Sequence, residues 1–199
     1  RMGDFYEMFY DDAMTASRAL ELTLTSRQKD RSGVAIPMCG IPHHAADNYI
    51  GRLIRRGFKV AVCDQVEDPR QAKGIVKRDV VRIVTPSTYV HQSYLEEKES
   101  SYLMAIAPGP EMVGASLVDL STGDFVTSEY EGTKRWEQLE HSVSTYRPRE
   151  IVLPEDTELP AELWDGFGDS DRPVETRRET WRFDYEGARE LLLKQFGTV

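Results

Sequence analysis

Short segments with strand periodicity alternate with segments of helical periodicity along the whole chain of 199 residues. The strand-like segments are rich in β-branched residues, and the helical ones repeat apolar residues every three or four positions. We predict strands over residues 34–41, 59–65, 80–85, 102–107, 113–119, 124–128 and 151–153. We predict helices over residues 7–22, 45–56, 134–146 and 185–196. The alternation predicts an α/β fold in each half, with a partly antiparallel sheet in the second half.

Charge divides the chain more sharply than hydrophobicity does. Residues 1–90 hold 14 Lys and Arg against 11 Asp and Glu, whereas residues 91–199 hold 11 against 23. A mildly basic half followed by a strongly acidic half favours two domains with different partners. There is no apolar run of membrane-spanning length and no secretory leader, and the two cysteines suit a reducing compartment. We therefore expect a cytoplasmic protein that has no membrane partner.

Two large aromatic side chains flank a carboxylate in the run GDFYEMF at residues 3–9. Asp4 and Glu7 have the spacing of a helix capping box, in which case Phe5 would belong to the core. Alternatively, Phe5 is an exposed wedge at a strand-to-helix corner. An apolar side chain that enters the minor groove kinks the duplex, and this costs least where a base pair is already weak. The spacing alone leaves both interpretations open.

Glycine and proline punctuate the run MCGIPHH at residues 38–44 and permit a close approach of its backbone to a partner. Cys39, His43 and Cys63 are the candidate ligands of a metal site. Their spacing matches no common zinc template. We therefore predict no metal here, but a rigid loop that presents its backbone and small side chains to a partner.

Basic residues recur through the later part of the first half. They are Arg52, Arg55, Arg56, Lys59, Arg70, Lys73, Lys77, Arg78 and Arg82. On one face such residues would hold DNA phosphates, and binding would weaken with salt. The alternative is an ordinary solvated surface.

Two carboxylates, Asp119 and Asp124, bracket the run DLSTGDF at residues 119–125. Such a pair would hold Mg²⁺ for nuclease chemistry, but Asp followed four positions later by Gly is more often turn chemistry. We favour the turn. The sequence has no GxxxxGK[ST] phosphate loop, no GxGxxG and no Ser/His/Asp or Cys/His nucleophile set. We predict no catalytic residue, no cofactor and no enzymatic activity for this chain.

Several long segments, in the same order, resemble the bacterial MutS family of DNA mismatch-repair proteins. The run RMGDFYEMFYDDA at residues 1–13 resembles the family's mismatch-recognition signature. Two further runs resemble the rest of that domain: IPMCGIPHHAADNYIGRLIRRGFKVAVCDQVEDP and AKGIVKRDVVRIVTPST. Two later runs, GASLVDLSTGDF and YRPREIVLP, resemble the connector domain that follows it in the sequence.

The resemblance implies a particular domain organisation. It implies a mixed-sheet α/β mismatch-recognition domain over residues 1–88, a linker over 89–100, and an RNase H-like connector without nuclease activity over 101–199. It also places an edge strand before Arg1, so the first domain is expected to lack its N-terminal edge. The ATPase domain of the family lies outside these segments, so ATP and Mg²⁺ are expected to act only in the longer family proteins.

The implied function is recognition of base mismatches and small insertion/deletion loops in double-stranded DNA. Phe5 matches the family's phenylalanine that stacks on the mispaired base, and Glu7 matches the glutamate that hydrogen-bonds that base. The DNA-proximal loop of the family is matched by Met38, Gly40, Pro42 and His43. Basic residues near the DNA backbone are matched by Arg78 and Arg82.

The implied partners are mismatched duplex DNA, a MutL-type protein on the connector, and a second copy in a homodimer. The implied location is the bacterial cytoplasm, in association with the nucleoid. Two other functions stay open: a metal-dependent nuclease that uses Asp119 and Asp124, or a protein-interaction module in the second domain. Mg²⁺-dependent DNA cleavage would identify the nuclease. Equal affinity for heteroduplex and homoduplex would favour the interaction module.

Overall fold

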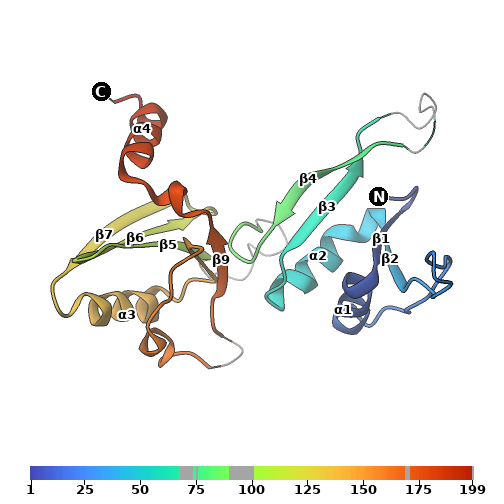
Figure 1. Cartoon of the computed structure of the whole chain (residues 1–199), viewed down its shortest axis with the longest axis horizontal. Coiled ribbons are helices and arrows are strands. Elements are labelled where there is room, and N and C mark those ends of the chain that lie inside the picture. The colour runs from blue at the N-terminus through green and yellow to red at the C-terminus, as the bar shows by residue number, and fades with distance from the viewer. Residues whose placement is uncertain (68–73, 75, 90–100, 169–170, 199) are drawn as a thin grey trace. The chain divides into compact units, whose positions relative to one another are not determined.

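The computed structural model describes residues 1–67, 74, 76–89, 101–168 and 171–198 (Figure 1). The chain forms two compact units, Arg1–Tyr89 and Val90–Val199. Both mix helices with strands, which confirms the predicted α/β class and the two-domain organisation. The predicted linker at 89–100 lies almost wholly outside the described residues, so the exact domain boundaries stay a prediction. No described helix has the length and apolar character to cross a bilayer.

The first unit contains two separate two-stranded sheets. One is formed by β1 (Phe5–Phe9) and β2 (Met38–Pro42), and the other by β3 (Val60–Gln65) and β4 (Arg78–Val84); both pairs are antiparallel. The described residues of this unit also form α1 (Tyr10–Leu20), the 3₁₀ helix η1 (His43–Ala45) and α2 (Ala46–Arg55).

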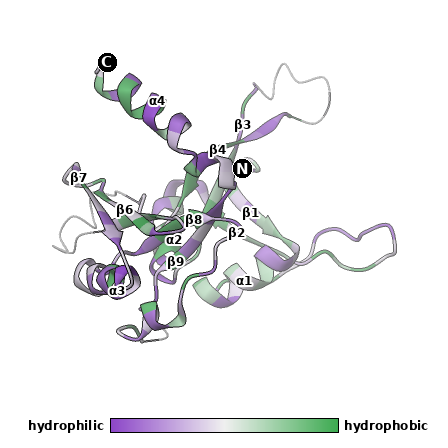
Figure 2. Ribbon diagram, turned by 60° about the vertical axis from the view of Figure 1, so that its left-hand side comes forward, coloured by the Kyte–Doolittle hydropathy of each residue, from purple (hydrophilic) through white to green (hydrophobic). Residues whose placement is uncertain are grey.

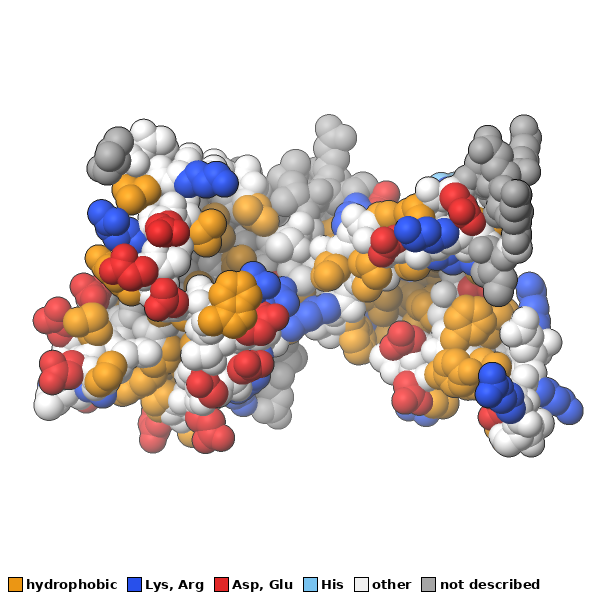
Figure 3. Space-filling model, turned by 45° about the horizontal axis from the view of Figure 1, so that its top comes forward, with side chains coloured by type: hydrophobic (Ala, Val, Ile, Leu, Met, Phe, Trp, Pro, Cys, Tyr) orange, Lys and Arg blue, Asp and Glu red, His pale blue; other side chains and the backbone are white. Residues whose placement is uncertain are grey.

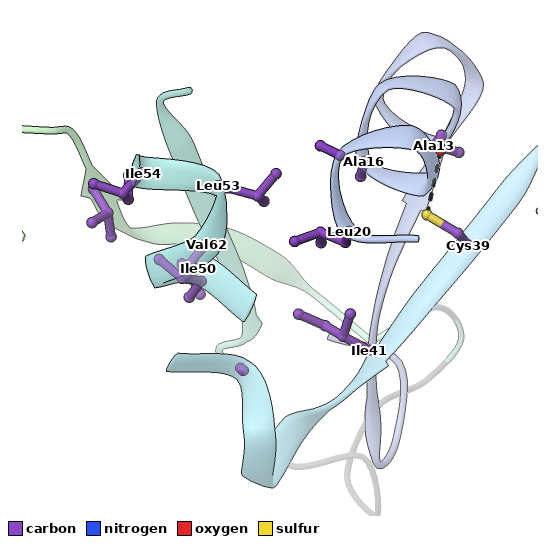
Figure 4. Packing of buried hydrophobic residues seen from close by; sticks show 12 residues of the cluster. Ala13, Ala16, Leu20, Cys39, Ile41, Ile50, Leu53, Ile54 and Val62 are labelled. Carbon is purple, nitrogen blue, oxygen red and sulfur yellow. Dashed lines mark hydrogen bonds between the residues drawn. The ribbon is translucent and has the colours of Figure 1, made fainter. Parts of the chain in front are cut away.

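The core of the first unit lies between α1, α2, β2 and β3. Helix α1 contributes three alanines and Leu20, and their small side chains let the backbone of β2 approach closely. Figure 4 shows Leu20 and Ile41 turned toward the apolar face of α2, which presents Ile50 and Leu53. Cys39 is fully buried there, and its thiol donates a hydrogen bond to the carbonyl of Ala13.

The N-terminal helix begins later than predicted. The predicted start at Glu7 is wrong, because residues 5–9 form strand β1 and α1 begins at Tyr10. The capping box is also wrong: Phe9 is the N-cap of α1, and no side chain caps this end of the helix. The chain turns from strand to helix at Tyr10, whose φ of 54° lies in the left-handed region that non-glycine residues rarely adopt.

The predicted strand at 34–41 also begins later than expected, at Met38. The residues before it form an ordered loop that follows α1 and projects as a largely hydrophilic segment (Figures 1 and 2). Two isolated antiparallel bridges, Thr25 with Met38 and Lys29 with Ala35, fold this loop back on itself. Val34 is 62% exposed at its far end, so its hydrophobicity did not indicate a buried strand.

Strand β4 is unusual for its apolar exposure. It pairs with β3 alone among the described strands. Val80, Val81 and Ile83 are all more than half exposed, whereas Val84 at its end is buried in the core. The two predicted strands in this region, 59–65 and 80–85, agree with β3 and β4 to within two residues.

The second unit is built on one five-stranded sheet of order β7-β6-β5-β8-β9. Its strands are β5 (Tyr102–Pro108), β6 (Met112–Asp119), β7 (Asp124–Glu131), β8 (Glu150–Pro154) and β9 (Val174–Arg178). The first three are antiparallel neighbours, whereas β8 and β9 run parallel to β5. This mixed order agrees with the RNase H-like fold that the resemblance implies.

Helix α3 (Arg135–Tyr146) covers one face of this sheet (Figure 1). Leu139 and Val143 are fully buried against the inward residues of β6 and β8. The remaining helical segments are η2 (Ala161–Trp164), η3 (Thr180–Phe183) and α4 (Tyr185–Phe196). The helices predicted at 134–146 and 185–196 are confirmed, whereas β9 and η2 were not predicted.

Candidate nucleic-acid interface

Strand β1 separates two kinds of side chain because successive residues of a strand point to opposite faces. Tyr6 and Met8 pack toward the core of the first unit. Phe5, Glu7 and Phe9 point the other way, and Phe5 is 48% exposed. Met2 and Phe9 are also exposed, and a group of exposed apolar side chains is a candidate contact for a partner. The exposure of Phe5 excludes its interpretation as a core residue.

A tight turn presents Phe5 at the very start of β1. The amide of Met2 donates to the carbonyl of Phe5 at 2.7 Å, and the amide of Phe5 donates to the carbonyl of Met2 at 3.2 Å. Gly3 has a φ of 58° inside this turn, a conformation that glycine adopts without a steric penalty. Phe5 therefore stands at a corner of the unit and not in the middle of a sheet face.

Strand β2 lies beside β1 in the same sheet. Phe5 pairs with Pro42, and Glu7 pairs with Gly40. A Cβ added at Gly40 would lie 3.4 Å from the carbonyl oxygen of Tyr6 and 3.6 Å from Cγ of Glu7. The missing side chain of Gly40 thus leaves room for the side chains of Phe5 and Glu7 to lie over β2.

The carboxylate of Glu7 lies beside Phe5 and faces a basic residue of the projecting loop. Nη1 of Arg27 is 3.8 Å from Oε1 of Glu7, and the two side chains are 75% and 12% exposed, respectively. An ion pair this long, with one partner so exposed, contributes little to stability. Arg27 is therefore available to exchange Glu7 for another anion.

Arg27, Lys29 and Arg31 are three exposed basic residues on the projecting loop, and the sequence analysis did not select them. Arg27 lies near β1 because the loop folds back at Thr25, which no local pattern indicated. The only sequence signal was the recurrence of basic residues between two apolar segments. This loop adds positive charge next to Glu7, on the face that carries Phe5.

Asp30 organises the far end of the loop through hydrogen bonds. Oδ1 of Asp30 accepts hydrogen bonds from the amides of Ser32 and Val34 at 2.8 and 2.9 Å and from the Ser32 hydroxyl. These bonds, led by the one from the Ser32 side chain, lower the pKa of Asp30. The carboxylate of Asp30 is thus engaged within the loop.

The four predicted loop residues do not all face the same way. Pro42 and Gly40 lie beneath Phe5 and Glu7, as described above. Met38 is only 6% exposed and belongs largely to the interior. His43 follows β2, and its amide donates to the carbonyl of Asp4 at 2.8 Å, beside Phe5.

The two predicted backbone-contacting arginines make internal contacts. Nε of Arg78 donates to the carbonyl of Arg1 at 2.9 Å, and its Nη1 donates to the carbonyl of Val76. Arg82 pairs with Asp47 at 3.1 Å, and both side chains are about half exposed. Arg78 therefore holds the start of the chain, whereas Arg82 lies on the surface in an exchangeable pair.

The other basic residues are spread over the unit. Arg52 lies near the ring of Tyr49 and donates to the carbonyl of Leu20. Arg70 and Lys73 lie outside the described residues. In Figure 3 exposed hydrophobic side chains lie on both units, and acidic side chains are more frequent on the second unit, at left.

The two metal sites that the sequence suggested as alternatives are not supported by the positions of their residues. Within the described ranges, no group of three or more His, Cys, Asp or Glu side chains is placed to hold an ion. Cys39 faces the core, whereas the His43 ring lies against Tyr6. These positions give no support to a shared thiol–imidazole site.

Asp119 and Asp124 face each other across the β6–β7 turn. Oδ1 of Asp119 accepts from the amide and hydroxyl of Ser121 at 2.8 and 2.6 Å, and the hydroxyl of Thr122 donates to Asp124. Both carboxylates thus stabilise the turn, which supports the turn interpretation over a nuclease site.

Family models account for nearly the entire chain. MutS domain I matches residues 1–93, and MutS domain II matches residues 101–199. The chain belongs to the MutS family. Its exposed phenylalanine and the adjacent glutamate therefore lie within MutS domain I, and the five-stranded sheet lies within MutS domain II.

Curated MutS relatives support the same assignment. The protein named DNA mismatch repair protein MutS from Alkaliphilus oremlandii is 41% identical over the whole chain, which spans 23% of that relative. The protein of the same name from Desulfosudis oleivorans is 46% identical, also over the whole chain, which spans 22% of it. The one from Pelotomaculum thermopropionicum is 50% identical over 77% of the chain and 18% of its own length. The chain thus spans about a fifth of the MutS relatives that it matches.

Proposed function

We propose that this chain recognises base mismatches and small insertion/deletion loops in double-stranded DNA as part of DNA mismatch repair. The relatives are named for mismatch repair, and the chain matches their first two domains. The observation that carries the proposal is the ring of Phe5, held 48% exposed at a corner of the first unit.

The ring of Phe5 acts as a wedge in the minor groove. Opening a base step costs a few kcal/mol, and it costs least at a mispaired base. Stacking of a base on an aromatic ring returns about 1–3 kcal/mol. The balance favours insertion only where the duplex is already weak, so the preference requires no base sequence to be read.

Glu7 acts as the polar reader beside the wedge. Its carboxylate lies next to the ring on the same face of β1, where a displaced base would arrive. Approach of the base exchanges the long contact between Glu7 and Arg27 for a hydrogen bond to that base. Gly40, Pro42 and His43 form the backbone surface next to the lesion, and Met38 supports it from within.

Basic residues of the first unit hold the phosphates. Arg27, Lys29 and Arg31 approach the backbone from the projecting loop, and Arg82 approaches it from β4 once its exposed pair with Asp47 opens. Arg78 contributes mainly by fixing the start of the chain. The acidic second unit makes no contact with DNA but connects to partner domains.

Further partners are proposed for the longer proteins of the family. We propose that a MutL-type protein docks on the second unit and that a homodimer forms through domains beyond those matched here. ATP hydrolysis and its Mg²⁺ belong to those other domains, so this chain is proposed not to be an enzyme. A cytoplasmic, nucleoid-associated location accompanies this proposal.

The test compares affinity for a heteroduplex that contains one mismatch with affinity for the matched homoduplex, at several salt concentrations. Measurements use the 199-residue chain and a chimera in which it replaces the matching segment of the Alkaliphilus oremlandii relative. We expect a preference for the heteroduplex. Phe5→Ala should abolish that preference and leave the salt dependence nearly unchanged, because the wedge touches no phosphate. Equal affinity of the unsubstituted chimera for both duplexes would contradict the proposal.

Arg27→Gln provides the complementary control. Loss of one phosphate contact should reduce the slope of log affinity against log salt by about 0.9 and weaken both duplexes similarly. The heteroduplex preference should remain. If Arg27→Gln lost the preference but kept the salt slope, Arg27 would contact the mismatched base and not the DNA phosphates.

A further inference from the structure

Tyr6 lies between the two proposed recognition residues but points away from them. We propose that Tyr6 is a positioning residue, whose hydrogen bond to Asp64 anchors strand β1 to strand β3 and so keeps Phe5 and Glu7 aimed at the duplex. This inference rests on the proposed function, because it concerns how that site is held.

The anchor is a direct contact between two strands of different sheets. The hydroxyl of Tyr6 on β1 donates to Oδ2 of Asp64 on β3 at 2.9 Å, in a partly buried position. Burial, followed by the hydrogen bond to Asp64, raises the pKa of Tyr6, so the hydroxyl keeps its proton and remains a donor. Oδ1 of Asp64 is buried and has no hydrogen-bond partner within the described part of the chain. Tyr6 thus bonds to one oxygen of this carboxylate, and the other oxygen depends on no described group.

The ring of Tyr6 is fixed from a second side. Its centroid lies 5.4 Å from that of the His43 ring, at an interplanar angle of 30°. The amide of His43 in turn donates to the carbonyl of Asp4, the residue before Phe5. The Tyr6 ring therefore contacts His43, the residue that is hydrogen-bonded to the chain just before Phe5.

Strand β1 needs such an anchor because its own sheet is small. It pairs only with β2 among the described strands, and the β1–β2 and β3–β4 sheets are separate. A two-stranded sheet is marginally stable by itself. A wedge that must wait in water before it meets a lesion binds best when its strand is already held in the bound geometry. Hydrogen bonds to Cys63 and Arg78 hold Arg1, ahead of the strand, and the link between Tyr6 and Asp64 adds a restraint within β1 itself.

The competing interpretation is that Tyr6 merely fills the core. Tyr6→Phe separates the two, because the substitution keeps the ring and its contact with His43 but removes the hydroxyl. Met8→Leu is the matched control: Met8 is the next inward residue of the same strand and packs against the same core. Both variants are expected to remain folded.

The experiment measures heteroduplex and homoduplex affinity with the chimera described above, together with the stability of each variant. Tyr6→Phe should reduce the heteroduplex preference by up to about tenfold, the scale of one hydrogen bond, with the salt slope unchanged. Met8→Leu should leave the preference intact at a similar loss of stability. Equal losses of preference in the two variants, or none in Tyr6→Phe, would overturn the inference.

A double-mutant cycle tests whether Asp64 is the partner through which Tyr6 acts. If one hydrogen bond carries the effect, Asp64→Ala combined with Tyr6→Phe should cost no more preference than the larger single loss. Additive losses would overturn the proposed pairing. Failure of the function itself is recognised separately, because the unsubstituted chimera would then show no preference.

Discussion

Gly40 gives the outward side chains of β1 the room that they occupy. A Cβ there would meet the Tyr6 carbonyl at 3.4 Å and Cγ of Glu7 at 3.6 Å, with Cδ1 of Phe5 at 3.9 Å. A Cβ alone would thus lie at ordinary contact distance, whereas the branches of a larger side chain would extend beyond it towards Glu7 and Phe5. The recognition geometry therefore depends on a residue that need not contact a base.

Gly40→Val is expected to reduce the heteroduplex preference at least about fivefold, because its γ-methyl groups extend past the Cβ position and overpacking costs about 1–3 kcal/mol. The salt slope should stay the same, since the phosphate contacts lie elsewhere. Duplex titrations check this. Gly114→Ala is the control, because a Cβ at Gly114 lies 3.8 Å or more from its neighbours in the second unit. Full preference in Gly40→Val would refute the crowding argument.

At single residues, the sequence predicted the recognition pair but not what surrounds it. Phe5 and Glu7 came from a motif, and the exposure of Phe5 agrees with the proposed wedge, although its contact with a base stays a prediction. Arg27 and the anchor Tyr6–Asp64 were not predicted, because both join residues far apart in the chain. Such contacts depend on tertiary packing that residue spacing does not encode.

Among the elements, the β6–β7 turn offers a clean test of electrostatics. Burial of Asp119 by itself raises the pKa, but the hydrogen bonds from the side chain and amide of Ser121 outweigh it, so the pKa is lowered overall. A carboxyl with a lowered folded pKa stabilises the fold above its unfolded pKa, and this contribution is lost as the pH falls through the folded value. The turn should therefore weaken in acid.

Asp119→Asn keeps an acceptor for Ser121 but removes the titration. The unsubstituted chain should be the more stable of the two at pH 7, and this difference should shrink below about pH 4. Urea unfolding followed by tryptophan fluorescence measures it, because Trp136, Trp164 and Trp181 all lie in the second unit. A difference that is independent of pH would show that the charge of Asp119 is not involved.

Most helices and strands could be predicted from the sequence, whereas strands β1 and β9 could not. Helix α3 and strands β5 and β6 follow clear periodicity. Strand β1 was assigned to a helix because Met8 and Phe9 fit a helical repeat with the alanines of α1. The left-handed backbone of Tyr10, which ends the strand, has no signature in residue type. Strand β9 was missed because its charged sequence, VETRR, lacks strand alternation.

At the scale of the whole chain, the two units have separate cores and opposite charge balance. Thermal unfolding followed by far-UV circular dichroism and by tryptophan fluorescence should therefore give transitions that do not coincide. Heteroduplex DNA should raise the transition of the first unit and leave the tryptophan signal unchanged, since ligands stabilise only what they bind. Coincident transitions that shift together with DNA would contradict this independence.

The exposed valines and isoleucine of β4 have a practical consequence. Among the described strands β4 is paired on one edge only, and such an edge with apolar side chains on its surface is a template on which a second copy can add, strand to strand. Concentrated samples of the chain should therefore aggregate through this hairpin before the acidic second unit does. Ile83→Lys would place a charge on this strand and should therefore slow the aggregation of the chain.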